Sequence, residues 1–219
     1  MIQELHRAYL QRYPKRRVHL ILTGSHTARL QLERGAPPGI FISASPQHID
    51  ALDRLGQVAH RQTIAYNELV LLTRSALKIH NLSEIHRAKR WGLGDPRVPI
   101  GELAWSLLDE IKVNQRPLLT LITPRIVTRS LSARALRGRA QRNELDATVL
   151  YRTDLFMLRQ WYTLPLPHSL VSKYRAHYEL AITRDHSRGP VSTRAYDWLK
   201  MMNSPLGKRI ITKLGFQTH

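Results

Sequence analysis

The sequence predicts an α/β fold in which short apolar strands alternate with longer helices. Three observations lead to this expectation: strand-sized apolar runs recur along the chain, stretches with helical spacing separate them, and serine–proline pairs and glycines punctuate the helices. Because strands and helices alternate, we expect mainly parallel pairing in the sheets.

The strand candidates are short runs rich in β-branched and apolar residues. They are Val18–Thr23, Ile40–Ala44, Leu69–Thr73, Gly92–Gly94, Leu118–Ile122, Ala147–Tyr151 and Tyr178–Thr183.

The helices are expected between these runs, where apolar residues recur three and four positions apart. One such apolar face is formed by Leu103, Leu107, Leu108 and Ile111. The pairs Ser45–Pro46 and Ser204–Pro205 each place a capping residue before a proline at the first helical position. Gly56 and Gly215 stand where helices should end.

Length and composition set further bounds. With 219 residues the chain can bury a substantial core, as one large domain or two smaller lobes. The chain has no cysteine, which excludes disulfides and thiolate metal sites. No apolar run is long enough to span a bilayer, and Met1–Leu5 lacks the basic start and apolar middle of a signal peptide.

The charge balance is strongly basic, with 34 Lys and Arg against 16 Asp and Glu and a formal net charge of +18. Such a surface attracts anions of many kinds, including oxoanions, nucleic acid and acidic lipids. The arginines between Arg125 and Arg142 follow no single helical stripe, and no nucleic-acid-binding motif accompanies them. Solvated faces therefore explain them better than a nucleic-acid site.

Other chemistries find little support. The histidines show no metal-ligand spacing, since His80 and His86 are six positions apart and His168 and His177 nine. Gly92–Asp95 lacks the lysine of a phosphate loop and the third glycine of a dinucleotide loop. No nucleophile motif is present. We therefore expect neither an enzyme nor a metal site.

The most informative stretch runs from Gly24–Arg29 through Gly35–Pro37 to Phe41–Ser45. It is typical of a strand, a polar turn, a helix, a glycine-stopped loop and a second strand. This order places a serine hydroxyl and free backbone N–H groups at the start of a helix, where the helix dipole favours a small anion.

The stretch resembles the periplasmic molybdate-binding protein family, the solute receptors of molybdate ABC importers. In that family a serine-rich turn leads into a helix, then Gly-Ala-Pro, then a strand. The resemblance continues over nearly the whole chain, through Asn67–Leu71, Gly94–Gly101, Val149–Asp154, Ser204–Gly207 and Leu214–Phe216.

The resemblance implies a two-lobed periplasmic binding protein fold of type II, with a ligand cleft between the lobes. Lobe one would comprise 1–67 plus 184–219, and lobe two 75–177. The chain would cross between them at the hinge segments 68–74 and 178–183.

The resemblance also implies which residues bind the oxoanion. Ser25 corresponds to the serine of the serine-rich turn, and Tyr151 to a tyrosine whose hydroxyl reaches the anion. Ile100 and Ala133 correspond to positions that offer a backbone N–H. The chain departs from the family at Ile100, where alanine is usual and the bulkier side chain would narrow or re-aim the pocket. It departs again at Gly39 and Ser45, which stand in place of aspartates.

A further departure concerns the front of the chain. The family opens with a strand and a serine-bearing turn, whereas this sequence opens within the helix that should follow, at Met1–Leu5. Our hypothesis is that Met1 is an internal methionine and that a signal peptide and the first strand precede it. If Met1 is the true start, we expect weak or no oxoanion binding and a cytoplasmic protein.

Our leading interpretation is a periplasmic, monomeric receptor that captures molybdate or tungstate, without a cofactor, and docks on the membrane subunits of an ABC permease. One alternative is a divergent member that binds another small anion or acts as a sensor. An alternative of another class is a basic cytoplasmic protein that contacts nucleic acid or another macromolecule.

Overall fold

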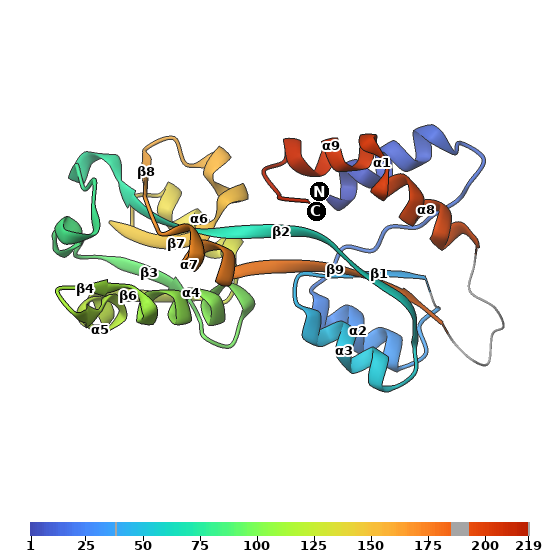
Figure 1. Cartoon of the computed structure of the whole chain (residues 1–219), viewed down its shortest axis with the longest axis horizontal. Coiled ribbons are helices and arrows are strands. Elements are labelled where there is room, and N and C mark those ends of the chain that lie inside the picture. Colours follow the sequence, from blue (N-terminus) through green and yellow to red (C-terminus); the bar gives the residue numbers. More distant parts are fainter. Residues whose placement is uncertain (38, 185–192, 219) are drawn as a thin grey trace. The chain divides into compact units, whose positions relative to one another are not determined.

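The computed structural model describes residues 1–37, 39–184 and 193–218. The chain divides into two compact units, Met1–Tyr66 with His177–His219, and Asn67–Ala176 (Figure 1). An α/β fold is what the sequence predicts, and two lobes are what the family resemblance implies. The segments expected as hinges, 68–74 and 178–183, belong to the second and the first unit respectively, and their role as hinges stays a prediction.

The first unit is built on three strands in the order β1-β9-β2. β1 and β9 pair antiparallel, with Ile42 opposite Leu180. Its elements are α1 (Ile2–Arg12), α2 (Ser25–Glu33), β1 (Ile40–Ser43), α3 (Pro46–Arg54), the first part of β2 (Val58–Arg74), most of β9 (Arg175–Thr183), α8 (Thr193–Asn203) and α9 (Pro205–Lys213).

Helices cover both faces of this sheet (Figure 1). Along β1, Phe41 points to the face where Ile49 and Leu52 of α3 are buried. The adjacent residues Ile40 and Ile42 point to the other face, which α1, α8 and α9 cover. The period of two along a strand thus divides the apolar residues between two cores.

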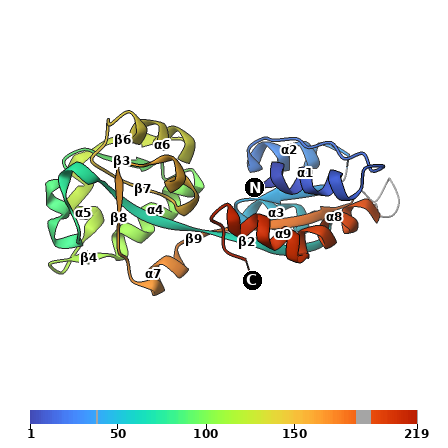
Figure 2. The ribbon, with the colours of Figure 1, turned by 90° about the horizontal axis from the view of Figure 1, so that it is seen from above.

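The second unit has the strand order β2-β7-β3-β6, with β8 also paired to β2 (Figure 2). Its longer elements are β3 (Trp91–Gly94), α4 (Pro99–Glu110), α5 (Leu118–Ile122), β6 (Ile126–Ser130), α6 (Ala133–Gln141), β7 (Ala147–Tyr151), β8 (Trp161–Leu164) and α7 (His168–Lys173). The short elements are β4 (Lys112–Val113), β5 (Arg116–Pro117) and the 3-10 turns η1 (Ser75–Leu77), η2 (Leu82–Arg87), η3 (Thr123–Arg125) and η4 (Arg152–Met157).

Only one side of this sheet, made of β7, β3 and β6, is parallel. β3 pairs parallel with β6 and with β7, whereas β2 pairs antiparallel with β7 and β8, and β1 with β9. The expectation of mainly parallel pairing is therefore wrong outside β3, β6 and β7. Each of these parallel strands ends at the same edge of the sheet, and this edge positions the candidate site.

Two strand predictions are also wrong. Leu118–Ile122 is the helix α5, in which Leu118 and Ile122 are buried at a helical spacing of four after the N-cap Pro117. Val18–Thr23 forms no strand, and Ile21 and Leu22 are 75% and 59% exposed. Among the described residues no strand lies beside Val18–Thr23 to supply backbone partners.

The punctuation of the helices is confirmed. Ser45 and Ser204 are the N-caps of α3 and α9, each followed by proline, and the Ser204 hydroxyl accepts from the Gly207 N–H. Gly56 and Gly215 adopt φ values of 68° and 85° just after their helices, a region that glycine enters without strain. In the described part of the chain, no helix combines the length and apolarity that crossing a membrane requires.

Candidate anion-binding site

The first unit presents the start of α2 beside the end of β1. Ser25 is the first helical residue, after the extended N-cap Gly24, and its hydroxyl lies 3.4 Å from the Ala44 N–H, from which it accepts. The first intrahelical bond runs from the Ala28 N–H to the Gly24 carbonyl. The N–H groups of the first turn therefore precede the helical ladder and are available to an anion.

Serines shape the turn that follows β1. The buried Ser43 hydroxyl donates to the Ser45 carbonyl at 2.6 Å and accepts from the Ser45 N–H at 3.1 Å. This local pairing holds the backbone between β1 and α3. Neither α2 nor α3 has an acidic residue in its first turn, so no side-chain carboxylate opposes an anion there.

In the second unit, the other three candidate residues follow the parallel strands at one edge of the sheet. Ile100 lies in the first turn of α4, which follows β3, and Ala133 is the first residue of α6, which follows β6. Tyr151 ends β7 itself. The structure thus brings Ile100, Ala133 and Tyr151 to one edge of one unit. Ser25 belongs to the other unit.

Ile100 presents its backbone, because its side chain is turned inward. The side chain is 3% exposed, and a Cβ at Gly94 would lie 2.8 Å from its Cγ2 atom. The atoms by which isoleucine exceeds alanine are therefore packed inside the second unit. Nearby, three hydrogen bonds from Arg97 to the Asp95 carboxylate lower the pKa of that carboxyl to about 2.

Ala133 begins a helix that favours a negative partner. The Ser132 hydroxyl caps α6 by accepting from the Ala135 N–H at 3.1 Å, and the ladder begins with the bond from the Leu136 N–H to the Ser132 carbonyl. The N–H of Ala133 precedes both bonds. The first turn of α6 has no acidic residue.

Tyr151 is 9% exposed and lies where β7 passes into η4. Three residues later, the buried carboxylate of Asp154 accepts from Arg137 of α6 at 2.6 Å. Burial raises the pKa of Asp154, although Arg137 opposes the change. This ion pair connects α6 to the turn after β7, and so links the two elements that carry Ala133 and Tyr151.

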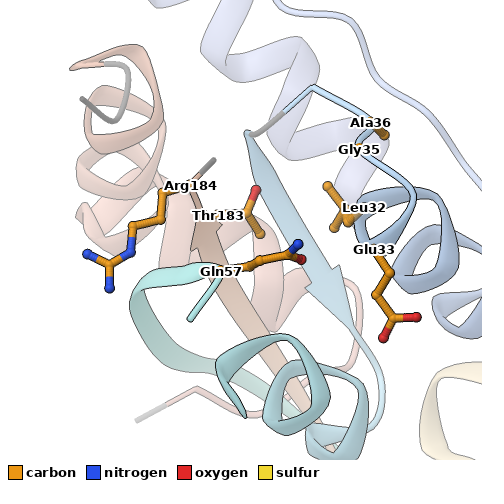
Figure 3. A pocket seen from close by; sticks show the side chains of 7 residues that line it. All are labelled: Leu32, Glu33, Gly35, Ala36, Gln57, Thr183 and Arg184. Carbon is orange, nitrogen blue, oxygen red and sulfur yellow. The ribbon is translucent and has the colours of Figure 1, made fainter. Parts of the chain in front are cut away.

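Two hollows in the described structure lie elsewhere. A small one of about 100 Å³ in the first unit is lined by Leu32, Glu33 and Gln57 among others (Figure 3). It lies at the carboxyl end of α2, where the helix dipole disfavours an anion. A larger one, of about 460 Å³ in the second unit, includes Arg74 at the end of β2 and Asn143 before β7. It therefore lies at the sheet edge opposite Tyr151.

Metal binding finds no support in the side chains. Among the described residues, no group of three or more His, Cys, Asp or Glu side chains could hold a metal ion.

Comparison of the sequence with known proteins shows the family to which this chain belongs. A family model described as bacterial extracellular solute-binding protein matches residues 1–217. The chain belongs to this family.

Two curated relatives of this solute-binding protein are named molybdate-binding protein ModA. The one from Haemophilus influenzae is 24% identical over 98% of this chain and 84% of its own length. The one from Escherichia coli is 26% identical over 88% of this chain and 75% of its own length. A solved structure, the periplasmic molybdate-binding protein of Azotobacter vinelandii, matches all of this chain and 94% of its own with a TM-score of 0.75 at 18% identity.

Sequence reasoning about this solute-binding protein missed the groups that surround the candidate residues. The pair between Arg137 and Asp154 spans 17 positions and has no local sequence signal. The rings of His26 and His48 lie tilted to each other with centroids 5.9 Å apart, although 22 positions separate them in the sequence. The only sequence signal for this contact was that both histidines were expected near the start of a helix.

Proposed function

We propose that this solute-binding protein captures a tetrahedral oxoanion, molybdate or tungstate, and delivers it to an ABC importer. The observation that carries the proposal is the likeness of nearly the whole chain to two relatives named molybdate-binding proteins. The geometry of each unit is compatible with it, since helix starts without acidic first-turn residues occur at Ser25 and Ala133.

The proposed site uses neutral donors. Ser25 would offer its hydroxyl and N–H, Ile100 and Ala133 their N–H groups, and Tyr151 its hydroxyl. Several such donors can replace the hydration shell of an oxoanion, because a hydrogen bond to a charged group is stronger than one between neutral groups. The ligand is the oxoanion itself, without a cofactor, and we propose no catalytic step.

The proposal extends to the setting of the protein. The receptor would act as a monomer in the periplasm and pass its ligand to the membrane subunits of a permease. Segments 68–74 and 178–183 would serve as hinges, with the bound oxoanion favouring the closed state through contacts made only there.

The test is a calorimetric and thermal titration of the protein with molybdate, tungstate, sulfate and phosphate. At a hundredfold excess over its dissociation constant, a specific ligand should add about 2.7 kcal/mol to the free energy of unfolding. We expect molybdate and tungstate to do so, and sulfate and phosphate to require higher concentrations, because the anions share a shape but differ in size.

Two variants locate the binding. Ser25→Ala and Tyr151→Phe should each weaken molybdate binding by at least about tenfold, since each removes a hydroxyl donor to a charged ligand. Tyr162→Phe, a change at a 41% exposed tyrosine in β8, is the matched control and should leave affinity unchanged. An equal response to all four anions, or full affinity in both site variants, would overturn the proposal.

A further inference from the structure

The first turns of α2 and α3 lie together and both carry a histidine. His26 is the second residue of α2 and His48 the third residue of α3, and their ring centroids are 5.9 Å apart. α2 packs through Ala28 and Leu32 against the core to which Ile49 of α3 belongs. Both histidines thus belong to the first turns of their helices, and His26 directly follows Ser25, whose hydroxyl accepts from the Ala44 N–H.

The charges around this pair leave it without an acidic partner. On α2, the positive charge of Arg29 acts on His48, and Glu33 is bound to Arg29. The acidic groups of α3, Asp50 and Asp53, turn instead to Arg61 of β2, which also binds Glu179 of β9. Within the described residues, neither imidazole makes a hydrogen bond or an ion pair.

The surroundings of His48 disfavour its protonated form. Burial of the half-buried ring lowers the pKa of His48, and Arg29 and His26 lower it further. All of these causes disfavour a positive charge. An anion at the helix starts acts in the opposite sense, because a negative charge nearby stabilises the protonated ring.

We propose that His26 and His48 form a titratable, cationic part of the oxoanion site, so that the first unit takes up a proton when the anion binds. The inference rests on the function proposed above and adds two binding residues to it. The proton comes from the solvent and adds to an imidazole nitrogen, while the oxoanion keeps its charge. Binding is thereby strengthened by the positive charge that the added proton supplies.

Two consequences distinguish this site from one made of neutral donors alone. Affinity should rise as the pH falls from about 8 to about 6, the range in which an imidazole side chain can change charge. A doubly charged oxoanion should gain more than a singly charged one, because the attraction scales with the product of the charges. The pair would thus contribute to selection by charge, separately from selection by size.

The test measures anion binding by calorimetry at about pH 6 and about pH 8, where the imidazole is the side chain that changes charge. Sulfate, whose charge is constant over this range, is the probe, together with molybdate. We expect affinity at least about tenfold higher at the lower pH. At an intermediate pH, titrations in two buffers of different ionisation enthalpy should show net proton uptake by the protein.

Substitutions of His26 and His48 test whether these two residues cause the pH dependence. His48→Gln and His26→Gln keep a polar side chain but cannot be protonated, and each should reduce both the pH dependence and the proton uptake. The matched control is His168→Gln, at an exposed histidine of α7 in the second unit, which should retain both. The buffer comparison on the unaltered protein remains decisive if a variant does not fold.

The outcomes separate the two proposals. Binding of molybdate with the same affinity at both pH values, without proton uptake, overturns this inference and leaves the proposed function standing. Proton uptake that persists when both histidines are replaced also overturns it. Failure of every anion to bind at either pH overturns the proposed function and this inference with it.

Discussion

Gly101 shows how a single residue fixes the start of α4 against the end of β3. A Cβ at this position would lie 1.9 Å from the Asp95 carbonyl oxygen, a backbone atom that cannot move aside cheaply. Trp105, which also belongs to α4, donates from its Nε1 atom to the Gly94 carbonyl of β3 at 3.0 Å. The N–H of Ile100 is therefore positioned by the absence of a side chain one residue later.

We predict that Gly101→Ala lowers the free energy of unfolding by more than about 3 kcal/mol, because α4 must move away from β3. Gly138→Ala is the matched control within α6, where the nearest atom to an added Cβ is the flexible Arg142 side chain at 3.4 Å. That change should stabilise the protein by about 0.5–1 kcal/mol through helix propensity. Urea unfolding of both variants checks the prediction, and equal stabilities would contradict it.

At the scale of elements, α6 is fixed at its first turns by a cap and by a buried ion pair. Ser132 satisfies an N–H at the start of the helix, and one turn further on Arg137 binds Asp154 beyond the end of β7. The side chains of Arg137 and Asp154 are 22% and 8% exposed, so solvent screens their attraction only in part. The relative placement of Ala133 and Tyr151 depends on this contact.

Arg137→Met should destabilise the protein by about 3–5 kcal/mol at neutral pH, since it leaves the Asp154 carboxylate buried without its cation. The pKa of Asp154 is already raised by burial, so the folded state binds its proton more tightly than the unfolded state. Its contribution to stability is therefore greatest below the ordinary aspartate pKa and declines as the pH rises through the raised value. The deficit of the variant should accordingly shrink in acid.

Chemical unfolding at about pH 7 and about pH 5 measures both effects. The control is Arg139→Met, on the same helix, whose exposed pair with Glu144 should be worth about 0–1 kcal/mol at either pH. A deficit for Arg137→Met no larger than for the control would show that the buried pair does not fix α6.

At the scale of the whole molecule, the net charge of +18 can attract anions without any specific site. Binding at the proposed site must therefore be distinguished from this general attraction. Many of the arginines already have a partner, including Arg61, Arg90, Arg97 and Arg152, each bound to a carboxylate. The excess positive charge nevertheless attracts polyanions over the surface. Such attraction depends on counterion release, whereas a hydrogen-bonded site holds its ligand by fixed donors.

We predict that any binding of random-sequence DNA weakens by at least about tenfold when salt rises from about 50 to about 200 mM. Molybdate affinity should change much less over the same range, because the proposed donors are fixed hydroxyl and backbone N–H groups. Fluorescence anisotropy with labelled DNA and calorimetry with molybdate provide the comparison. Salt-resistant, sequence-dependent DNA binding would instead favour the macromolecule-binding alternative.

Much of the fold was accessible from local sequence patterns. The serine–proline caps, the glycines after helices, and β1, β3, β7 and most of α4 follow from propensity and periodicity. Predictions failed where local signals are ambiguous. The run Leu118–Ile122 is as apolar as a strand, and only its packing made it a helix. The strand expected at Leu69–Thr73 is part of the much longer β2, because its pairing with β9 extends it.

The sequence by itself determined the alternation of strands and helices, the caps, the basic charge and the order of motifs that resembles a molybdate receptor. The alternation and the caps depend on residues close together in the chain, the charge on composition, and the order of motifs on the linear sequence. The tertiary structure decided which strands are antiparallel and that Ile100, Ala133 and Tyr151 share one edge. It also decided that Arg137 meets Asp154 and His26 meets His48. These contacts join residues far apart in sequence, and such pairs form only once the elements have packed.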